Sequence, residues 1–230
     1  MPDIGKELIN LDDSKKIGLI KSISQRPDEY PNSIQIMEIL SKDNDDEIRW
    51  TVAEALMEFD DIHAEQILNS LVIDENETVR VCACESLRYG RTKETIRLLK
   101  ERLIIDKSSL VRGYAALSLA DIVREDPSLP DFELVPFLKE RINKEKNAGV
   151  KISIYKSLYN LGEREYLDLL LHEINNREYR NRCAVVNLVS DSISEENKKK
   201  VLPFLKQRLK IEKTVAVKSI IEEVLNEFEE

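Results

Sequence analysis

Two histidines and three cysteines are the side chains of this 230-residue chain that best suit metal binding or nucleophilic catalysis. The histidines, His63 and His172, stand far apart in the sequence. A metal centre needs several ligands and a nucleophile needs a neighbouring base, so these few groups do not assemble either kind of site. We therefore predict no catalytic residue, metal or cofactor, while the sequence leaves open whether the protein is an enzyme.

The three cysteines, Cys82, Cys84 and Cys183, are an odd number and fall within predicted helices. Cys82 and Cys84 are two residues apart on one helix, so their side chains point in different directions and pair with difficulty. Unpaired thiols are typical of a reducing compartment. The first residues, Met1 to Ile20, contain no continuous apolar run. We expect a cytoplasmic protein without a signal peptide or a membrane-spanning helix.

One pattern, an apolar residue followed by Arg or Lys and then by a helical run of small and apolar residues, recurs six times along the chain. The occurrences are Ile48-Arg49, Val79-Arg80, Val111-Arg112, Val150-Lys151, Tyr179-Arg180 and Val217-Lys218. They are separated by 31, 32, 39, 29 and 38 residues. A recurrence in that range marks a repeat array, in which each unit is too small to fold alone and shares its core with its neighbours.

Each repeat has the pattern of two helices joined by a short polar turn. In the second helix, apolar or small residues recur four and eight places after the start of the pattern, as in Ile48, Val52 and Leu56. This spacing predicts one buried stripe on each second helix. Gly90 and Gly162 are expected to end helices in the left-handed conformation.

The composition suits exposed amphipathic helices, with 34 % charged and 42 % hydrophobic residues. The formal net charge is −9. That charge argues against nucleic acid as a partner, because nucleic-acid binding depends on neutralising phosphates. It favours a basic protein partner, since opposite charges speed encounter.

Three segments resemble the second helix of HEAT and HEAT-like (PBS-lyase-type) repeats. They are Asp45-Asp46-Glu47-Ile48-Arg49 with Val52-Ala53, Glu77-Thr78-Val79-Arg80 with Ala83, and Ser109-Leu110-Val111-Arg112 with Ala115. The resemblance covers about residues 31–228 and is weaker after residue 145.

The resemblance implies an all-α fold, a right-handed α-solenoid of about six antiparallel helix pairs whose second helices line the concave side. We expect a single array over residues 1–230, with an N-terminal helical cap at 1–30. The repeats are expected near residues 31–59, 62–90, 92–123, 131–162, 163–191 and 195–228.

In HEAT proteins the repeated basic residue typically pairs with acids in its own turn or in a neighbouring turn. The resemblance therefore assigns Arg49, Arg80, Arg112 and Lys151 to a structural ladder. Acidic residues stand three to six places upstream of several of them. The alternative is a stripe that binds anions or nucleic acid.

Some positions of the second helices should escape the buried stripe and face the concave side. In the first repeats they combine acidic and aromatic side chains, as binding hot spots do. We predict that a partner contacts Trp50, Glu54, Glu85, Tyr89, Tyr114, Asp121 and Lys156. In the alternative interpretation, Trp50 packs between repeats and the acids are only solvated.

The predicted function is a non-catalytic protein-binding scaffold or adaptor, in one version an inhibitor or immunity-type protein that occludes a basic partner. Enzymatic HEAT-like branches supply the alternatives. A base-excision enzyme needs a basic groove, and the fifth repeat offers one basic cluster, Arg177, Arg180 and Arg182. A di-iron hydroxylase needs several His-Glu dipeptides, and this chain has one, His172-Glu173. Bilin lyases contain similar repeats, but no residue here carries their activity across. The sequence does not indicate an oligomeric state.

Overall fold

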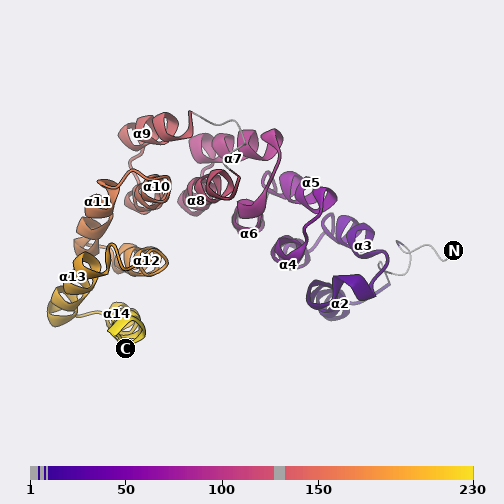
Figure 1. Cartoon of the computed structure of the whole chain (residues 1–230). Helices are drawn as coiled ribbons and strands as arrows, with labels where there is room; N and C mark the ends of the chain where they lie inside the picture. Colours follow the sequence, from indigo (N-terminus) through magenta and orange to yellow (C-terminus); the bar gives the residue numbers. More distant parts are fainter. Residues whose placement is uncertain (1–4, 6–7, 9, 127–132, 230) are drawn as a thin grey trace. The chain divides into compact units, whose positions relative to one another are not determined.

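The computed structural model describes residues 5, 8, 10–126 and 133–229, and its regular elements are all helical (Figure 1). These residues form thirteen α-helices and four short 3-10 helices, without a strand. The all-α solenoid expected from the sequence is therefore confirmed. The chain divides into two compact units, Met1–Leu129 and Pro130–Glu230. That both units belong to one array stays a prediction.

The helices of the first unit form two rows (Figure 1). One row consists of α2 (Asp13–Gln25), α4 (Asp46–Ala55), α6 (Glu77–Ser86) and α8 (Ser109–Glu125). The other consists of α3 (Ser33–Leu40), α5 (Ile62–Leu71) and α7 (Lys93–Ile105). The 3-10 helices η1 (Pro27–Glu29), η2 (Leu56–Glu58) and η3 (Leu87–Tyr89) follow α2, α4 and α6. Within the expected cap, residues 1–4, 6–7 and 9 lie outside the described residues.

The second unit contains three helix pairs. Its second helices are α10 (Ala148–Asn160), α12 (Tyr179–Ser190) and α14 (Val215–Glu229), and each contacts the next. Its first helices are α9 (Leu134–Lys144), α11 (Tyr166–His172), which continues as η4 (Glu173–Asn175), and α13 (Lys198–Ile211). The expected start of the fourth repeat at residue 131 lies outside the described residues.

The buried stripe predicted from the four-residue spacing is present in the structure. Ile48, Val52 and Leu56 of the first repeat are at most 1 % exposed, and so are the residues at the same positions in the next three repeats. Each stripe packs against the paired helix and the neighbouring second helix, so the core is shared between repeats.

The second helices begin at capped turns. Side chains that accept hydrogen bonds from first-turn N–H groups are Asp45, Asn76, Ser108 and Asn147. Neighbouring turns are also joined to one another. Asn76 donates to the Asp46 carboxylate, and Ser108 Oγ donates to Glu77 Oε1 at 2.7 Å. These contacts fix the spacing of α4, α6 and α8 at their N-terminal ends.

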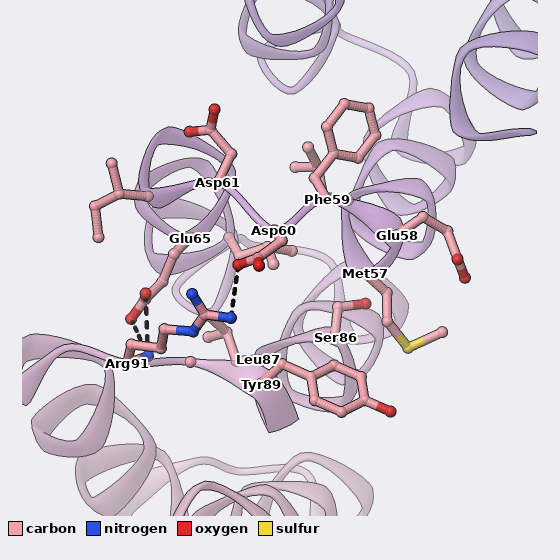
Figure 2. Close-up of a pocket in the computed structure, with 14 residues that line it drawn as sticks. Met57, Glu58, Phe59, Asp60, Asp61, Glu65, Ser86, Leu87, Tyr89 and Arg91 are labelled. Carbon is pink, nitrogen blue, oxygen red and sulfur yellow. Dashed lines mark hydrogen bonds and ion pairs between the residues drawn. The ribbon is translucent and has the colours of Figure 1, made fainter. Parts of the chain in front are cut away.

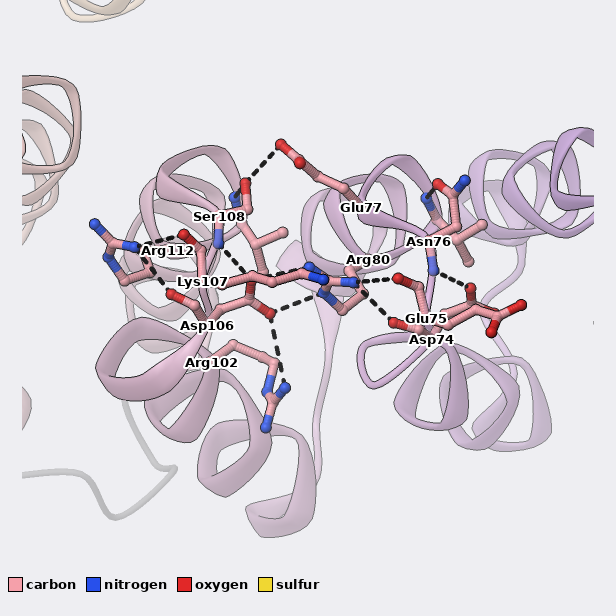
Figure 3. A network of polar contacts seen from close by, with 12 residues as sticks. Asp74, Glu75, Asn76, Glu77, Arg80, Arg102, Asp106, Lys107, Ser108 and Arg112 are labelled. Carbon is pink, nitrogen blue, oxygen red and sulfur yellow. Dashed lines mark hydrogen bonds and ion pairs between the residues drawn. The ribbon is translucent and has the colours of Figure 1, made fainter.

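Buried arginine side chains join consecutive repeats of the first unit (Figure 3). Arg80 is 4 % exposed and donates through Nε and Nη2 to the carboxylate of Asp106, at 2.8 and 3.1 Å. Its Nη1 donates to the backbone oxygens of Asp74 and Glu75, in the turn before its own helix. Arg49 makes the same bidentate contact with Asp74, one repeat earlier. Each guanidinium thus ties its own turn to the next.

The acids of these turns are also bonded to their own backbone. Asp74 Oδ1 accepts a hydrogen bond from the N–H of Asn76, and Asp106 Oδ1 accepts one from the N–H of Ser108. Burial alone would raise the pKa of the Asp74 carboxyl. The hydrogen bonds from Arg49 and from the Asn76 N–H outweigh burial and hold that pKa below its ordinary value. Asp74 is therefore charged in the folded protein.

The other two ladder positions differ. Arg112 Nη1 donates to the backbone oxygens of Asp106 and Lys107, in its own turn. The side chain of Lys151 is half-buried and makes no hydrogen bond or ion pair within the described part of the chain. In the following turn Asn176 occupies the position of the acid, and its Oδ1 accepts from the N–H of Glu178.

The two glycines expected to end helices behave differently. Gly162 has a φ of 98°, in the left-handed region that favours glycine. Gly90 has a φ of −62°, so the expectation of a left-handed cap there is wrong. A Cβ atom at Gly90 would lie 2.7 Å from Thr95 Cγ2 and 3.0 Å from the backbone oxygen of Leu87. Glycine is needed at residue 90 because two repeats approach closely there.

Replacing Asp74 with Asn should destabilise the protein by about 3 kcal/mol, because it leaves the buried Arg49 guanidinium without its carboxylate. Asparagine can keep the turn, as Asn176 does in the fifth repeat. Urea unfolding followed by circular dichroism measures the change. Glu75→Gln is the control, since that side chain is 93 % exposed and 3.9 Å from Arg49. Equal stability of the two variants would contradict a structural role for the pair.

The same ion pairs should make stability depend on pH on the acid side. Asp74, and Glu212 in the equivalent pair with Arg182 of the second unit, have folded-state pKa values below their ordinary values. Their contribution is therefore complete above the unfolded pKa of about 4 and is lost as the pH falls through the folded values. We expect the free energy of unfolding to fall below about pH 4, and to fall less steeply in Asp74→Asn. Parallel pH profiles of the two proteins would contradict this prediction.

Candidate functional site

Five residues of α4, α6 and α8 form a surface of the first unit that we call the second-helix face. They are Trp50, Glu54, Cys82, Glu85 and Tyr114. The two carboxylates are exposed, while the two aromatic side chains and the thiol are half-buried. The structure thus brings onto three successive helices four of the residues predicted to contact a partner, together with a cysteine that the prediction left out.

Buried hydroxyl groups lie under the second-helix face and hydrogen-bond to the backbone of its helices. Ser118 of α8 is 2 % exposed and donates to the backbone oxygen of Cys84 in α6 at 2.7 Å. Thr51 of α4 is 3 % exposed and donates to the Glu47 oxygen in its own helix, at 2.6 Å. Because these hydroxyl groups already have hydrogen-bond acceptors inside the protein, they are not available to bind a partner protein.

Negative charge is concentrated on the second-helix face. Burial raises the pKa of the Glu85 carboxyl, Arg88 opposes this, and the charge of Glu54 adds to it. Burial, with Glu54 and Glu85, raises the pKa of the Cys82 thiol to about 11. Burial, with Glu85, also raises the pKa of the Tyr114 phenol. Thiol and phenol therefore stay protonated near neutral pH, and the face is suited to binding a cation rather than to nucleophilic attack.

Asp121 and Tyr89, two further residues of the predicted site, belong to a separate cluster around η3. Asp121 is paired with Arg88 at 2.9 Å and with Arg124 at 3.4 Å, and its side chain is 13 % exposed. The guanidinium carbon of Arg88 lies 5.5 Å from the centre of the Tyr89 ring. Because the charge of Asp121 is balanced within the chain, it attracts a basic partner less than the exposed acids do.

The prediction that Lys156 contacts a partner is wrong. Lys156 is 4 % exposed, so it is not available to a partner. From α10 it donates to the backbone oxygen of Leu188 at 2.6 Å and to the Ser192 hydroxyl. These bonds tie α10 to the end of α12. The position corresponds to that of Glu54 and Glu85, but here a long side chain reaches the neighbouring helix instead of solvent.

The basic cluster of the fifth repeat is also divided by the fold. Arg182 is 7 % exposed and donates to the Glu212 carboxylate through Nε and Nη2, both at 2.9 Å. Its Nη1 donates to the backbone oxygens of Asn176 and Arg177. Arg182 therefore makes the contacts that Arg49 and Arg80 make in the first unit. Arg180, which the sequence pattern places in that role, is exposed. The pattern is shifted by two residues, and Arg182 is not part of a surface patch.

A cleft lies in the first unit where two consecutive repeats meet (Figure 2). Its volume is about 370 Å³, and η2, η3, the loops after them and α5 line it. The apolar residues that line it are Leu56, Met57, Phe59, Ile62, Leu68 and Leu87. Tyr89 is the residue of the predicted site that also lines the cleft. Sequence reasoning missed the others because the loops between repeats carry no periodic pattern, and the acidic run Asp60-Asp61 was the available signal.

The described residues contain neither a candidate metal site nor a candidate membrane-spanning helix. Residues 5, 8, 10–126 and 133–229 contain no group of three or more His, Cys, Asp or Glu side chains able to hold a metal ion. Among the helices of these residues, none is long and apolar enough to cross a membrane. Cys82, Cys84 and Cys183 are free thiols.

Residues 35–120 match the family of HEAT repeats. A chain in the solved complex of CpcE and CpcF of phycocyanin lyase from Nostoc sp. PCC7120 has a similar fold, with a TM-score of 0.58 and 13 % sequence identity. The alignment covers 99 % of this chain and 94 % of that chain. A designed armadillo repeat protein, YIII(Dq)4CqI, has a TM-score of 0.37 at 16 % identity, covering 96 % of this chain and 97 % of that one. No curated protein sequence matches the chain.

Helix pairs that stack on one another and share their core define an α-solenoid repeat protein. The family match lies in the first unit, and the second unit repeats the same pairing of helices. Residues 35–120 are therefore HEAT repeats, within a chain whose fold is an α-solenoid.

Arg182 and Arg180 should respond differently to the same substitution. Arg182→Gln removes one partner of a buried ion pair, and we expect a loss of about 3 kcal/mol in the free energy of unfolding. Arg180→Gln should leave the unfolding midpoint unchanged, because that side chain is exposed. Urea unfolding of both variants is the measurement. An unchanged unfolding midpoint in Arg182→Gln would contradict the structural role of Arg182.

Proposed function

We propose that this protein is a non-catalytic binding scaffold or adaptor whose second-helix face holds a basic protein partner. The observation that carries the proposal is the placement of Glu54 and Glu85 on adjacent helices. Both are exposed, and the charge of Glu54 contributes to raising the pKa of the Glu85 carboxyl. Carboxylates held this close repel each other, and a cation from a partner removes that repulsion.

The aromatic residues supply the apolar part of the surface. Trp50 and Tyr114 are half-buried, so one side of each is fixed by the protein and the other is open to a partner. The indole N–H of Trp50 has no hydrogen-bond partner within the part of the chain that the structure describes. Rigid aromatic groups with a polar edge, next to charge, have the character of binding hot spots.

In its more specific form, the proposal is an inhibitor or immunity-type protein that occludes a basic partner, for instance a toxin nuclease. The net charge of −9 supports it, because long-range attraction speeds the encounter with a cationic protein. The similar phycocyanin lyase structure is a complex of CpcE and CpcF, which is an example of this type of fold in a complex with a protein. A cytoplasmic location belongs to the same proposal and is supported by the three free thiols.

The test is capture of partners from host lysate on the purified wild-type chain and on a Glu54→Lys/Glu85→Lys variant shown to be folded by circular dichroism. We expect a basic protein to be retained by the wild type and lost by the variant. Glu38→Lys/Glu94→Lys is the matched control, because it makes the same charge change at exposed residues of α3 and α7, in the other row.

Trp50→Ala then tests the hot spot with the captured protein. We expect its affinity to fall by on the order of 2 kcal/mol, measured by calorimetry, with no change in the unfolding midpoint. Loss of the fold would make Trp50 a packing residue. Equal capture by both charge variants would place the binding surface elsewhere, and nucleic acid in the eluate would favour the nucleic-acid alternative.

A further inference from the structure

The cleft between η2 and η3 combines apolar walls with an excess of carboxylates. Its charged residues are Glu58, Asp60, Asp61, Glu65 and Arg91, four acids and one base. At its border, the side chains of Ile62 and Tyr89 are 48 % and 56 % exposed. An apolar slot with negative charge at its mouth complements a side chain that has an apolar stem and a cationic head.

Two of the four carboxylates are already occupied within the chain. Glu65 is 8 % exposed and accepts hydrogen bonds from groups of residues 91–95. Asp61 caps α5 by accepting from its first-turn N–H. Glu58 and Asp60 are both exposed, and Asp60 is paired with Arg91.

The chain itself holds a guanidinium at the mouth of the cleft. The side chain of Arg91 reaches across to Asp60, with Nη2 2.6 Å from Oδ1 (Figure 2). The two side chains are 66 % and 76 % exposed, and such exposed pairs contribute little to stability. Asp60 thus accepts a guanidinium in the folded protein and can exchange it for another at small cost.

We propose that this cleft binds an arginine side chain of a protein partner. The aliphatic stem lies against Met57 and Ile62, and the guanidinium replaces that of Arg91 on Asp60. Arginine is favoured over lysine because its planar fork matches a carboxylate and stacks on an aromatic ring, here that of Tyr89. That the arginine belongs to a protein rests on the function proposed above.

The test uses the intact chain with isotope-labelled methionine methyl groups, observed by NMR. Met57 lines the cleft, whereas Met37 is fully buried in the core, so the first reports binding and the second is an internal control. The probe is N-acetyl-arginine methylamide, and the citrulline analogue is its uncharged control. We expect a saturable shift of the Met57 signal, with a dissociation constant on the order of 1–10 mM for so small a ligand. The citrulline analogue should bind about five-fold more weakly or worse.

Two pairs of variants separate the cleft from general charge effects. Asp60→Asn should weaken the arginine probe by about five-fold, and Arg91→Gln should strengthen it by about three-fold, because the resident cation is gone. Asp28→Asn and Lys93→Gln make the same charge changes at exposed residues that do not line the cleft. These two controls should leave the dissociation constant unchanged.

An unmoved Met57 signal, equal binding of the two probes, or equal effects of Asp60→Asn and Asp28→Asn would overturn the proposal. The probe needs no partner, so these outcomes leave the test of the second-helix face independent. A captured partner that binds Asp60→Asn as tightly as the wild type would also overturn it, even if the Glu54→Lys/Glu85→Lys variant had lost that partner.

Discussion

The buried contact between an arginine and the turn acid of the next repeat is the constraint on which the rest of the structure depends. A guanidinium that is 4 to 7 % exposed is costly to bury unless each of its nitrogens is hydrogen-bonded. Arg49, Arg80 and Arg182 meet this requirement with one carboxylate of the next turn and two backbone oxygens of their own turn. Because the contact spans two turns, it fixes the offset between neighbouring repeats and aligns their second helices.

Pairing inside the chain also separates structural acids from those open to a partner. Glu65 is buried, Asp74 is half-buried, and both are surrounded by donors, so their charge is used within the fold. Glu54 and Glu85 stand on helices that the same contacts hold side by side, and they remain exposed. The ladder thus produces the acidic second-helix face without contributing a residue to it. This is how an interaction of the core determines a property of the surface.

The second unit meets the same constraint by different means at one junction. Between α10 and α12 the arginine is replaced by Lys151 and the acid by Asn176, so the bidentate contact is absent from the described residues there. The buried Lys156 connects the same two helices through the Leu188 oxygen and Ser192. The contact that joins these second helices therefore starts from the middle of α10 and not from its N-terminal end. The repeat therefore tolerates loss of a ladder residue when another buried donor spans the helices.

Sequence by itself determined the helices and the buried stripe of Ile48, Val52 and Leu56, because periodicity acts over a few residues. It also indicated that Glu54 and Glu85 occupy equivalent positions. Only the tertiary structure decided that Arg182, rather than Arg180, is the buried arginine of the fifth repeat, and that Lys156 is buried. Those outcomes depend on contacts between residues about one repeat apart in sequence, where a shift of two residues turns a side chain from the core to the solvent.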